Sequence, residues 1–313
     1  MVEPKVKIFS GRASRYLAEK IAAAYGAELG KSDVITFSDG EFQTSFEENV
    51  RGDDIFIVQS TFSPTENLFE LLMMIDAAKR ASARKIIAII PYFGFARQDR
   101  KDKPRVPITA KLIANLLTVA GVSRIITVDF HADQIQGFFE TPVDHLYSSS
   151  LFIPYLRKQK ISDLMFASPD TGGTKRAAQY AKIFNTGFAI CYKQRSRPNV
   201  IDKMELIGEV EGQNVIILDD ILDTGNTMVK AADLIIKHGA ASVRAMITHP
   251  VLSGDAIERI EKSSISELIV SDTIPLYRES EKIKVLSMAD LLAEVITRVE
   301  NCQSISSLYS FKK

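Results

Sequence analysis

The chain has 313 residues, 46% of them hydrophobic and 25% charged, which is the composition of a globular protein with about two ordinary domains. Lys plus Arg and Asp plus Glu both number 39, and this zero net charge argues against binding to nucleic acid or membranes through overall basicity. The sequence has no apolar run of about 20 residues that could span a bilayer, and no secretory signal. Two cysteines, Cys191 and Cys302, without a C-x-x-C pair indicate reduced thiols, so we expect a cytoplasmic protein.

Short apolar runs and helical patterns alternate along the chain. The predicted strands are residues 5–9, 54–59, 85–91, 124–129, 165–168, 188–192, 214–219, 243–248 and 267–271. The predicted helices are residues 15–25, 67–82, 108–120, 172–183 and 227–238, and Gly121 and Gly239 stand at C-cap positions. Several strands are apolar on both faces, which is typical of parallel strands covered by helices. The pattern therefore predicts an α/β fold.

Two stretches of the sequence repeat the same pattern. Residues 53–91 can be laid over residues 212–250, and strand, polar loop, helix, turn and strand then occur in the same order. The acids and the glycine of the second stretch are replaced in the first by Gln59, Ser60, Ser63 and Thr65. We therefore expect two domains of like fold, joined near residues 144–150, of which only the second kept an anion site.

The segment VIILDDILDTGNT, residues 215–227, places acids at the carboxyl end of a predicted strand and a turn at the start of a helix. Ligands of open α/β sheets bind at that edge, and the N–H groups at a helix start bind phosphate. Carboxylates there accept hydrogen bonds from sugar hydroxyls, whereas a helix N-cap would explain one acid rather than three. The segment therefore predicts a sugar-phosphate site. Its residues are Asp219, Asp220, Asp223, Thr224, Gly225, Asn226 and Thr227.

This segment resembles the phosphoribosyl-diphosphate (PRPP) motif, which PRPP synthetases and phosphoribosyltransferases share. From residue 5 to the C-terminus, the chain is similar to the PRPP synthetases, or ribose-phosphate diphosphokinases. The resemblance implies two similar phosphoribosyltransferase-like domains, each a mostly parallel sheet flanked by helices. Residues 1–147 would carry ATP and subunit contacts, and residues 148–313 the ribose 5-phosphate site and a catalytic loop. The last residues would pack back on the first domain.

FSDGEFQTSFEENVRG, residues 37–52, is similar to a family segment that reaches into the ATP site of a neighbouring subunit. Without the resemblance, this segment reads as a polar turn before a strand. With it, the segment implies an obligate oligomer, because each ATP site would need a second copy of the chain. The residues assigned to ATP are Phe37, Asp39, Gly40 and Glu41.

PYFGFARQDRKDKPRVPITAKL, residues 91–112, combines aromatic and basic side chains after an apolar strand. This combination suits either single-stranded nucleic acid or the purine and triphosphate of a nucleotide. Zero net charge and the sugar-phosphate site favour the nucleotide. The resemblance assigns Arg97 and Gln98 to ATP and makes residues 99–105 a mobile loop.

Two further segments, residues 127–139 and 168–177, carry an acid after a predicted strand. By resemblance they bind the Mg-ATP complex and the transferred diphosphate. Gly172 and Gly173 would let the backbone approach the diphosphate at a helix start. Mg²⁺ prefers oxygen ligands, so a histidine is the least natural member of its ligand set. The residues implied as Mg²⁺ ligands are His131, Asp170 and Asp129.

The segment YKQRSRPNVIDKM, residues 192–204, brings several cations into one loop. Diphosphoryl transfer develops negative charge on phosphoryl oxygens, and cations on a loop stabilise that charge. An ordinary exposed basic loop would be the simpler reading without the neighbouring motifs. The resemblance makes Lys193 and Arg195 the catalytic pair, with Arg195 also contacting ribose 5-phosphate.

The chain departs from the family pattern at two positions. Asn226 stands where the family usually has glycine, and because asparagine tolerates positive φ, we expect the turn to be kept. His145 replaces an asparagine common near the nucleotide regulatory site, which weakens the expectation of inhibition by ADP. The positions that resemble the phosphate and ADP regulatory site are Arg51, Ser82, Arg105, Ser304 and Ser306.

The sequence thus predicts that ATP and D-ribose 5-phosphate give AMP and PRPP, with Mg²⁺ as cofactor. The partners expected are these substrates, inorganic phosphate and ADP as effectors, and further copies of the chain, six in all by resemblance, but neither nucleic acid nor a membrane. One alternative is a phosphoribosyltransferase that consumes PRPP without ATP, although the two cationic segments argue against it. Another alternative is a non-catalytic, synthetase-associated regulatory subunit, which should have a disrupted cationic loop.

Overall fold

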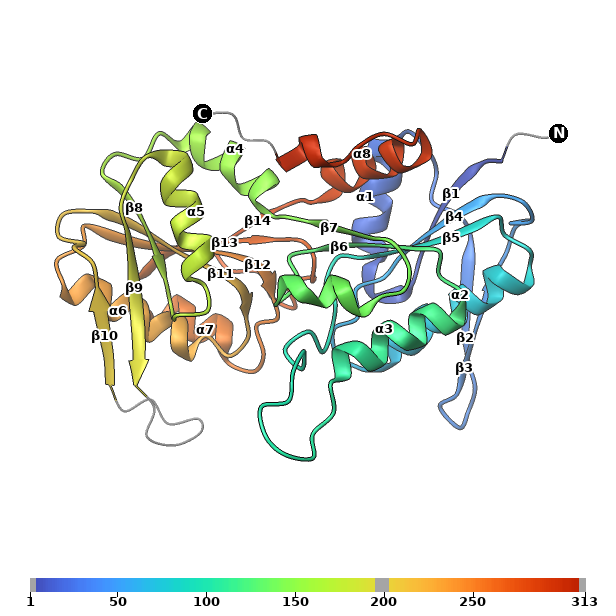
Figure 1. Ribbon diagram of the computed structural model, residues 1–313, viewed down its shortest axis with the longest axis horizontal. Coiled ribbons are helices and arrows are strands. Elements are labelled where there is room, and N and C mark those ends of the chain that lie inside the picture. The colour runs from blue at the N-terminus through green and yellow to red at the C-terminus, as the bar shows by residue number, and fades with distance from the viewer. Residues whose placement is uncertain (1–3, 195–202, 310–313) are drawn as a thin grey trace. The chain divides into compact units, whose positions relative to one another are not determined.

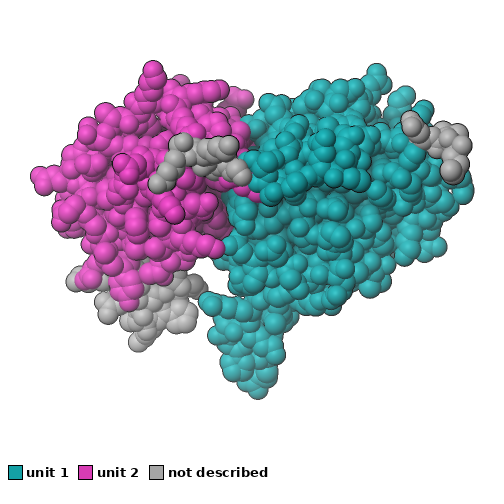
Figure 2. All heavy atoms as spheres, turned by 45° about the horizontal axis from the view of Figure 1, so that its top comes forward, with its two compact units in different colours: residues 1–148, 273–275, 287–308 teal, residues 149–272, 276–286, 309–313 magenta. Residues whose placement is uncertain are grey.

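The computed structural model describes residues 4–194 and 203–309 of the chain. Within it the chain divides into two compact units (Figure 2). Unit 1 consists of residues 1–148, 273–275 and 287–308, and unit 2 of residues 149–272, 276–286 and 309–313. The chain therefore crosses from unit 1 to unit 2 for the first time after Ser148. Its C-terminal part contributes to both units.

The sheet of unit 1 has the strand order β1-β4-β5-β6-β7, and every neighbouring pair is parallel (Figure 1). Its strands are β1 Val6–Ser10, β4 Asp54–Val58, β5 Lys85–Ile90, β6 Arg124–Val128 and β7 Val143–Leu146. All residues of β4 are buried, as its apolar run predicts for a strand covered on both faces. The only acid in this strand, Asp54, is neutralised by the Arg84 guanidinium at 2.5 Å.

Helices cover both faces of this sheet. The helices of unit 1 are α1 Arg15–Tyr25, α2 Glu66–Arg80, α3 Thr109–Ala120 and α8 Ala289–Glu300, with short 3-10 turns at η1 Arg12–Ser14 and η2 Asp133–Phe138. The α2 and α3 helices bury Leu71 and Ile113 against Ile55 and Ile57 of β4. The α1 helix packs against α8 from the end of the chain. Gly121 ends α3 in the left-handed conformation, as predicted.

An antiparallel hairpin, β2 Ser32–Thr36 and β3 Phe42–Phe46, follows α1 and extends away from the sheet of unit 1 (Figure 1). Its base is fixed because the Phe46 ring packs edge to face on the Phe9 ring, with 4.6 Å between centroids. Its tip, residues 37–41, is largely exposed.

The sheet of unit 2 has the order β10-β9-β8-β11-β12-β13-β14, and all pairs are parallel except β9 with β10. Its strands are β8 Leu164–Ser168, β9 Phe188–Gln194, β10 Lys203–Ile207, β11 Asn214–Leu222, β12 Ser242–Pro250, β13 Ile265–Ser271 and β14 Ile283–Leu286. The helices are α4 Ser149–Gln159, α5 Thr174–Phe184, α6 Asn226–Lys237 and α7 Ala256–Glu261. Alternate residues of β11 serve two cores: Ile217 faces the α6 side, and Ile216 faces the α4 and α5 side.

The two sheets repeat one topology. The strands β8-β11-β12-β13-β14 of unit 2 lie in the same sequential and spatial order as β1-β4-β5-β6-β7 of unit 1. In both units an antiparallel pair follows the helix that comes after the first strand of this order: β2 with β3 after α1 in unit 1, and β9 with β10 after α5 in unit 2. The predicted fold class, two phosphoribosyltransferase-like α/β domains, is therefore confirmed.

The predicted helices and strands are all present, with ends that shift by a few residues. The prediction missed five strands, β2, β3, β7, β10 and β14. In β2, β3 and β7 half or more of the residues are polar, whereas β10 and β14 are short strands of five and four residues at the two edges of the sheet of unit 2. The segment expected to be a junction, residues 144–150, contains most of β7 and the beginning of α4. In the described part of the chain, no helix is both long and apolar enough to cross a membrane.

Candidate active site

Two acids on β11 form the negative part of the site in unit 2. The strand was predicted to end at residue 219, but it runs to Leu222. Asp219 and Asp220 therefore lie within its last four residues. The backbone N–H of Asp220 donates to Asp219 Oδ1 at 2.9 Å, and Asp220 Oδ1 lies 3.9 Å from Nη2 of Arg176 on α5. Burial raises the pKa of Asp219 well above its usual range, and the neighbouring charge of Asp220 raises that pKa further. The pair therefore attracts hydrogen-bond donors and cations.

The turn after β11 directs backbone N–H groups to one side. Leu222 O accepts a hydrogen bond from the Leu252 N–H at 2.9 Å, and Asp223 O accepts one from the Ser253 N–H at 3.1 Å. Because the C=O and N–H of a trans peptide point in opposite directions, the N–H groups of Asp223 and Thr224 point away from residues 252–253. They join the first amides of α6, which have no acceptor inside the helix. Such a set of donors suits a phosphate.

The left-handed residue of this turn is Gly225, with φ of 77° and ψ of −12°, which is the conformation that glycine adopts most readily. Asn226 is the first residue of α6 and is not left-handed. The turn is thus kept as expected, but the reasoning that Asn226 must tolerate positive φ was wrong. Its Nδ2 instead donates to Thr224 Oγ1 at 3.4 Å, and Thr227 follows in the first turn of the helix.

The loop between β8 and α5 is closed by Asp170. Its Oδ1 accepts the N–H groups of Gly172 at 2.9 Å and Gly173 at 3.3 Å, which are the amides predicted to meet the diphosphate. A Cβ on Gly173 would lie 2.6 Å from Ser168 Oγ, so a side chain there would displace the Ser168 hydroxyl from Asp170 O, to which it donates at 2.5 Å. The carboxylate of Asp170 therefore already occupies the position of an anion at the start of α5.

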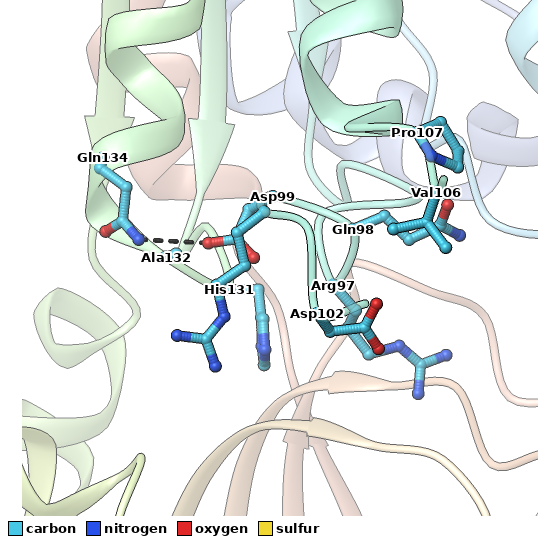
Figure 3. A pocket seen from close by; sticks show the side chains of 10 residues that line it. Arg97, Gln98, Asp99, Asp102, Val106, Pro107, His131, Ala132 and Gln134 are labelled. Atoms are coloured by element: carbon cyan, nitrogen blue, oxygen red, sulfur yellow. Dashed lines mark hydrogen bonds between the residues drawn. The ribbon is translucent and has the colours of Figure 1, made fainter. Parts of the chain in front are cut away.

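Unit 1 contains a cavity of about 480 Å³ at the loop after β5 (Figure 3). Arg97 and Gln98 line it, as do His131 and Gln134 from the segment after β6. Its remaining lining residues are Asp99, Arg100, Asp102, Val106, Pro107 and Ala132. The structure thus brings Arg97, Gln98 and His131 to one cavity. The mixture of cations, amides and short apolar side chains suits a nucleotide.

Hydrogen bonds hold the walls of this cavity. Gln98 Oε1 accepts the hydroxyl of Thr109 at 2.5 Å, which ties the loop to the beginning of α3. Gln134 Nε2 donates to Asp99 Oδ2 at 3.1 Å across the cavity (Figure 3). The loop is thus anchored at both walls, while the Arg97 side chain is exposed.

Asp129 and His131 lie differently, although they are two residues apart. Asp129 is buried with φ of 36°, and its carboxylate accepts the Ser148 hydroxyl at 2.5 Å. His131 is exposed on the cavity wall. In the described residues, no group of three His, Cys, Asp or Glu side chains could hold a metal ion by itself. The assignment of Mg²⁺ to Asp129, His131 and Asp170 stays a prediction.

The hairpin tip has its own internal bonds. Asp39 Oδ1 accepts the Glu41 N–H at 3.0 Å, and Gly40 is left-handed at φ of 93°. Phe37 is 47% exposed, although its ring is apolar. None of residues 37–41 is among the residues that line the cavity at Arg97.

Of the positions that resemble a regulatory site, the structure brings two pairs together. Arg51 Nη1 donates to Ser82 Oγ at 3.0 Å, and Ser82 is left-handed. The hydroxyls of Ser304 and Ser306 lie 2.7 Å apart. Arg105 is left-handed in the loop after β5.

The pair predicted to be catalytic, Lys193 and Arg195, lies at the edge of the described chain. The backbone of Lys193 is part of β9 and is paired with Met204 of β10, but its side chain is outside the described residues. Arg195 also lies outside them.

The sequence reading missed Arg176, whose guanidinium approaches Asp220. The signal was available, because Arg176 stands one turn after the Gly172–Gly173 pair on the helix that begins there. It also missed Ser148, which reaches Asp129 from a segment 19 residues away that was interpreted as a junction.

Comparison with known proteins relates the whole chain to one group. Residues 6–121 match the family model described as the N-terminal domain of ribose phosphate pyrophosphokinase, and residues 193–310 match the phosphoribosyl synthetase-associated domain. The chain is 54% identical over 310 residues to the ribose-phosphate pyrophosphokinase of Porphyromonas gingivalis, covering 99% of each. It is 52% identical over 304 residues to that of Wolinella succinogenes, covering 97% of this chain and 98% of the relative.

A solved structure agrees with these relatives. The crystal structure of phosphoribosylpyrophosphate synthetase from Mycobacterium smegmatis is similar to this chain with a TM-score of 0.90 and 38% sequence identity. The similarity covers 95% of this chain and 99% of that one.

Proposed function

Since the chain belongs to the ribose-phosphate pyrophosphokinase family, we propose that it transfers the β,γ-diphosphoryl group of ATP to the 1-hydroxyl of D-ribose 5-phosphate, giving PRPP and AMP. The observation that carries this proposal is the turn after β11. There Leu222 O and Asp223 O are bonded to residues 252 and 253, on the opposite side of their peptides from the amides of the turn, and Asp219 and Asp220 lie on the strand that leads into this turn. A phosphate and a polyol on one small molecule satisfy both groups.

In this proposal, the amides of residues 223–227 bind the 5-phosphate. Asp219 and Asp220 accept hydrogen bonds from ribose hydroxyls and so fix the ring with its 1-hydroxyl towards the diphosphate. The pKa of Asp219 is raised because burial and the charge of Asp220 disfavour its ionised form. Hydrogen bonds donated by the sugar hydroxyls would stabilise that ionised form and so reduce the repulsion between the two acids.

The nucleotide is assigned to the cavity of unit 1. Arg97 and Gln98 would bind ATP there, and His131 would contact its phosphates. In the loop between β8 and α5, the diphosphoryl group would replace the Asp170 carboxylate as the acceptor of the Gly172 and Gly173 N–H groups.

Mg²⁺ is the proposed cofactor, held by the ATP phosphates with Asp170, His131 and Asp129. The carboxylates fit this ion, because Mg²⁺ prefers oxygen ligands. Asp170 fits better than Asp129, whose carboxylate is buried against Ser148. When bound, Mg²⁺ neutralises the charge of the diphosphoryl group. Lys193 and Arg195 would stabilise the charge that develops during transfer.

We propose a homo-oligomer, with the six copies that the resemblance implies. Two apolar stripes support it: Phe69 and Met73 on α2, and Leu112, Leu116 and Val119 on α3, two helices that pack against each other. Their spacing places each set on one face of its helix. We call these five residues the α2–α3 face. Its exposure is high, 78% at Val119 and 54% at Phe69, which favours cover by a second copy of the chain.

The hairpin tip supports the same conclusion. Phe37, Asp39, Gly40 and Glu41 do not line the cavity of their own unit 1, and we assign them to the ATP site of another copy. Inorganic phosphate and ADP are the proposed effectors, acting at the Arg51–Ser82 and Ser304–Ser306 pairs together with Arg105.

One assay tests the function. The full chain is incubated with Mg²⁺, ATP and ribose 5-phosphate, with and without phosphate and ADP, and AMP release is measured together with PRPP. We expect equal amounts of AMP and PRPP. In a parallel reaction that contains PRPP and a free base in place of ATP and ribose 5-phosphate, formation of a nucleotide would instead establish a phosphoribosyltransferase, provided that the first reaction gives no AMP. The absence of both reactions would leave the non-catalytic, synthetase-associated regulatory subunit as the remaining alternative.

A further inference from the structure

A third carbonyl of the turn after β11 is held by a side chain. Nη1 of Arg259 donates to Thr224 O, next to the carbonyls of Leu222 and Asp223 that residues 252 and 253 hold. Three successive carbonyls therefore face one segment, residues 252–259, which follows β12. The two residues of the last of these contacts, Arg259 and Thr224, are 35 residues apart in the sequence.

The position of Arg259 is fixed by α7, which packs on the turn. A Cβ on Gly225 would lie 3.7 Å from Ala256 O and 3.9 Å from Ile260 Cδ1, so the backbone of the turn touches this helix. Ala256 and Ile260 are fully buried in the core of unit 2. Arg259 is next to Ile260 on that helix and reaches the turn from the same side.

A cation at this carbonyl acts on the other end of the same peptide. Thr224 O and the Gly225 N–H belong to one planar trans unit and point in opposite directions. A charge-assisted hydrogen bond polarises the peptide, which makes the N–H a stronger donor. The Gly225 N–H directly precedes the amides at the start of α6. Arg259 also places a positive charge beside a turn that contains Asp223 and follows Asp219 and Asp220 of β11.

We propose that Arg259 is a positioning residue for ribose 5-phosphate. It fixes the Thr224–Gly225 peptide so that its N–H faces the 5-phosphate, and it strengthens that donor without touching the ligand. This inference rests on the proposed function, because it takes the phosphate of ribose 5-phosphate as the anion bound at the turn.

The test compares Arg259→Met and Arg259→Lys in the full chain. The matched control is Arg278→Met, which removes a guanidinium that pairs with Glu261 of the same α7 at 2.8 Å and does not touch the turn.

KM is measured for each substrate, the Kd of ribose 5-phosphate by calorimetry, and Tm by calorimetric melting. For Arg259→Met we expect KM and Kd for ribose 5-phosphate to rise about tenfold, the factor for the loss of one charged hydrogen bond. KM for ATP, kcat and Tm should stay close to those of the control.

Arg259→Lys should recover part of the lost affinity, because a lysine can still donate to a carbonyl. Unchanged affinity in Arg259→Met would overturn the proposal, and so would an equal rise of both KM values with a fall in Tm, which marks a structural role. If Arg259→Met does not fold, Arg259→Lys decides alone, since unchanged Kd would contradict the proposal. A parent chain that binds ribose 5-phosphate but releases no AMP would refute the proposed function, and the Kd values would still test Arg259.

Discussion

Nε2 of His145 accepts the backbone N–H of Phe130 at 2.9 Å. Both residues are buried, and the next residue along the chain, His131, lines the cavity assigned to ATP. Since Nε2 is the acceptor, the neutral ring carries its proton on Nδ1, which lies 3.9 Å from Asp133 Oδ1. The residue that departs from the family pattern therefore holds the turn that presents His131.

Replacing His145 tests this role. His145→Leu leaves a buried N–H without its acceptor, which should lower the free energy of unfolding by about 1–3 kcal/mol. KM for ATP should rise several-fold while KM for ribose 5-phosphate stays the same. His145→Gln is the matched variant, because its Oε1 can reach the position of Nε2 and accept the same bond, and it should keep most of the stability. The measurements are urea unfolding and initial rates, and equal effects of Leu and Gln would contradict this role.

Gly94 should tolerate no side chain. It immediately precedes Phe95 and the loop of Arg97, its N–H donates to Thr61 Oγ1 at 2.7 Å, and a Cβ there would overlap Thr61 O. Gly94→Ala must therefore move the loop, and we expect a loss of about 1–3 kcal/mol in unfolding free energy and a higher KM for ATP. The control is Gly137→Ala, because a Cβ at Gly137 meets nothing within 4 Å. Equal KM values for ATP in the two variants would be evidence against a constraint at Gly94.

Asp219 gives stability a dependence on pH. Burial raises its folded-state pKa, and the charge of Asp220 adds to this shift, so the folded chain binds the proton more readily than the unfolded chain. The stability from protonated Asp219 is complete below the unfolded pKa of about 4 and is lost as pH rises through the folded pKa. Asp219→Asn keeps a neutral group at every pH and should melt at a higher temperature near pH 7.5.

Melting curves at pH 4 and pH 7.5 check this sign. The difference in Tm between Asp219→Asn and the parent should be small at pH 4 and should grow towards neutral pH. Asp255→Asn, an exposed acid of the same unit, is the control. A difference that stays constant with pH would show that Asp219 does not titrate as described. Asp219→Asn should also bind ribose 5-phosphate more weakly, because an amide accepts the sugar hydroxyls less strongly than a carboxylate.

The sequence predicted the parts of the site that lie on one continuous segment. The turn of residues 223–227 could be predicted because the acids before it, its own Asp223 and Gly225 and the following helix are neighbours in the chain. Arg259 could not be predicted, because only the packing of α7 brings it to Thr224. The β7 strand was missed for a similar reason: Asp144 and His145 make its sequence polar. Their burial depends on distant partners, since Arg124 holds the Asp144 carboxylate at 2.7 Å.

The α2–α3 face should hold copies of the chain together. Leu116→Glu places a charge in the middle of the apolar stripe, and a buried unpaired charge is strongly unfavourable. We expect a smaller species by light scattering after size-exclusion chromatography, with an unchanged far-UV circular dichroism spectrum at room temperature. Lys158→Glu, which puts the same carboxylate at an exposed position of α4, should leave the assembly unchanged. An assembly of unchanged mass in Leu116→Glu would show that this face is not an interface.

Lys193 should matter for turnover and not for binding of ribose 5-phosphate. It belongs to β9, beside the strand β8 that leads into the loop of Asp170, while the amides assigned to the 5-phosphate follow β11. Lys193→Ala removes a cation from the transferring group, and loss of one such stabilising group lowers kcat by about 10²–10³ or more. Calorimetry should still give the parent Kd for ribose 5-phosphate. Lys182→Ala, an exposed lysine in the last turn of α5, should keep full AMP release. Near-normal AMP release by Lys193→Ala would mean that the diphosphoryl group is stabilised from elsewhere, leaving Arg195 as the remaining candidate on that loop.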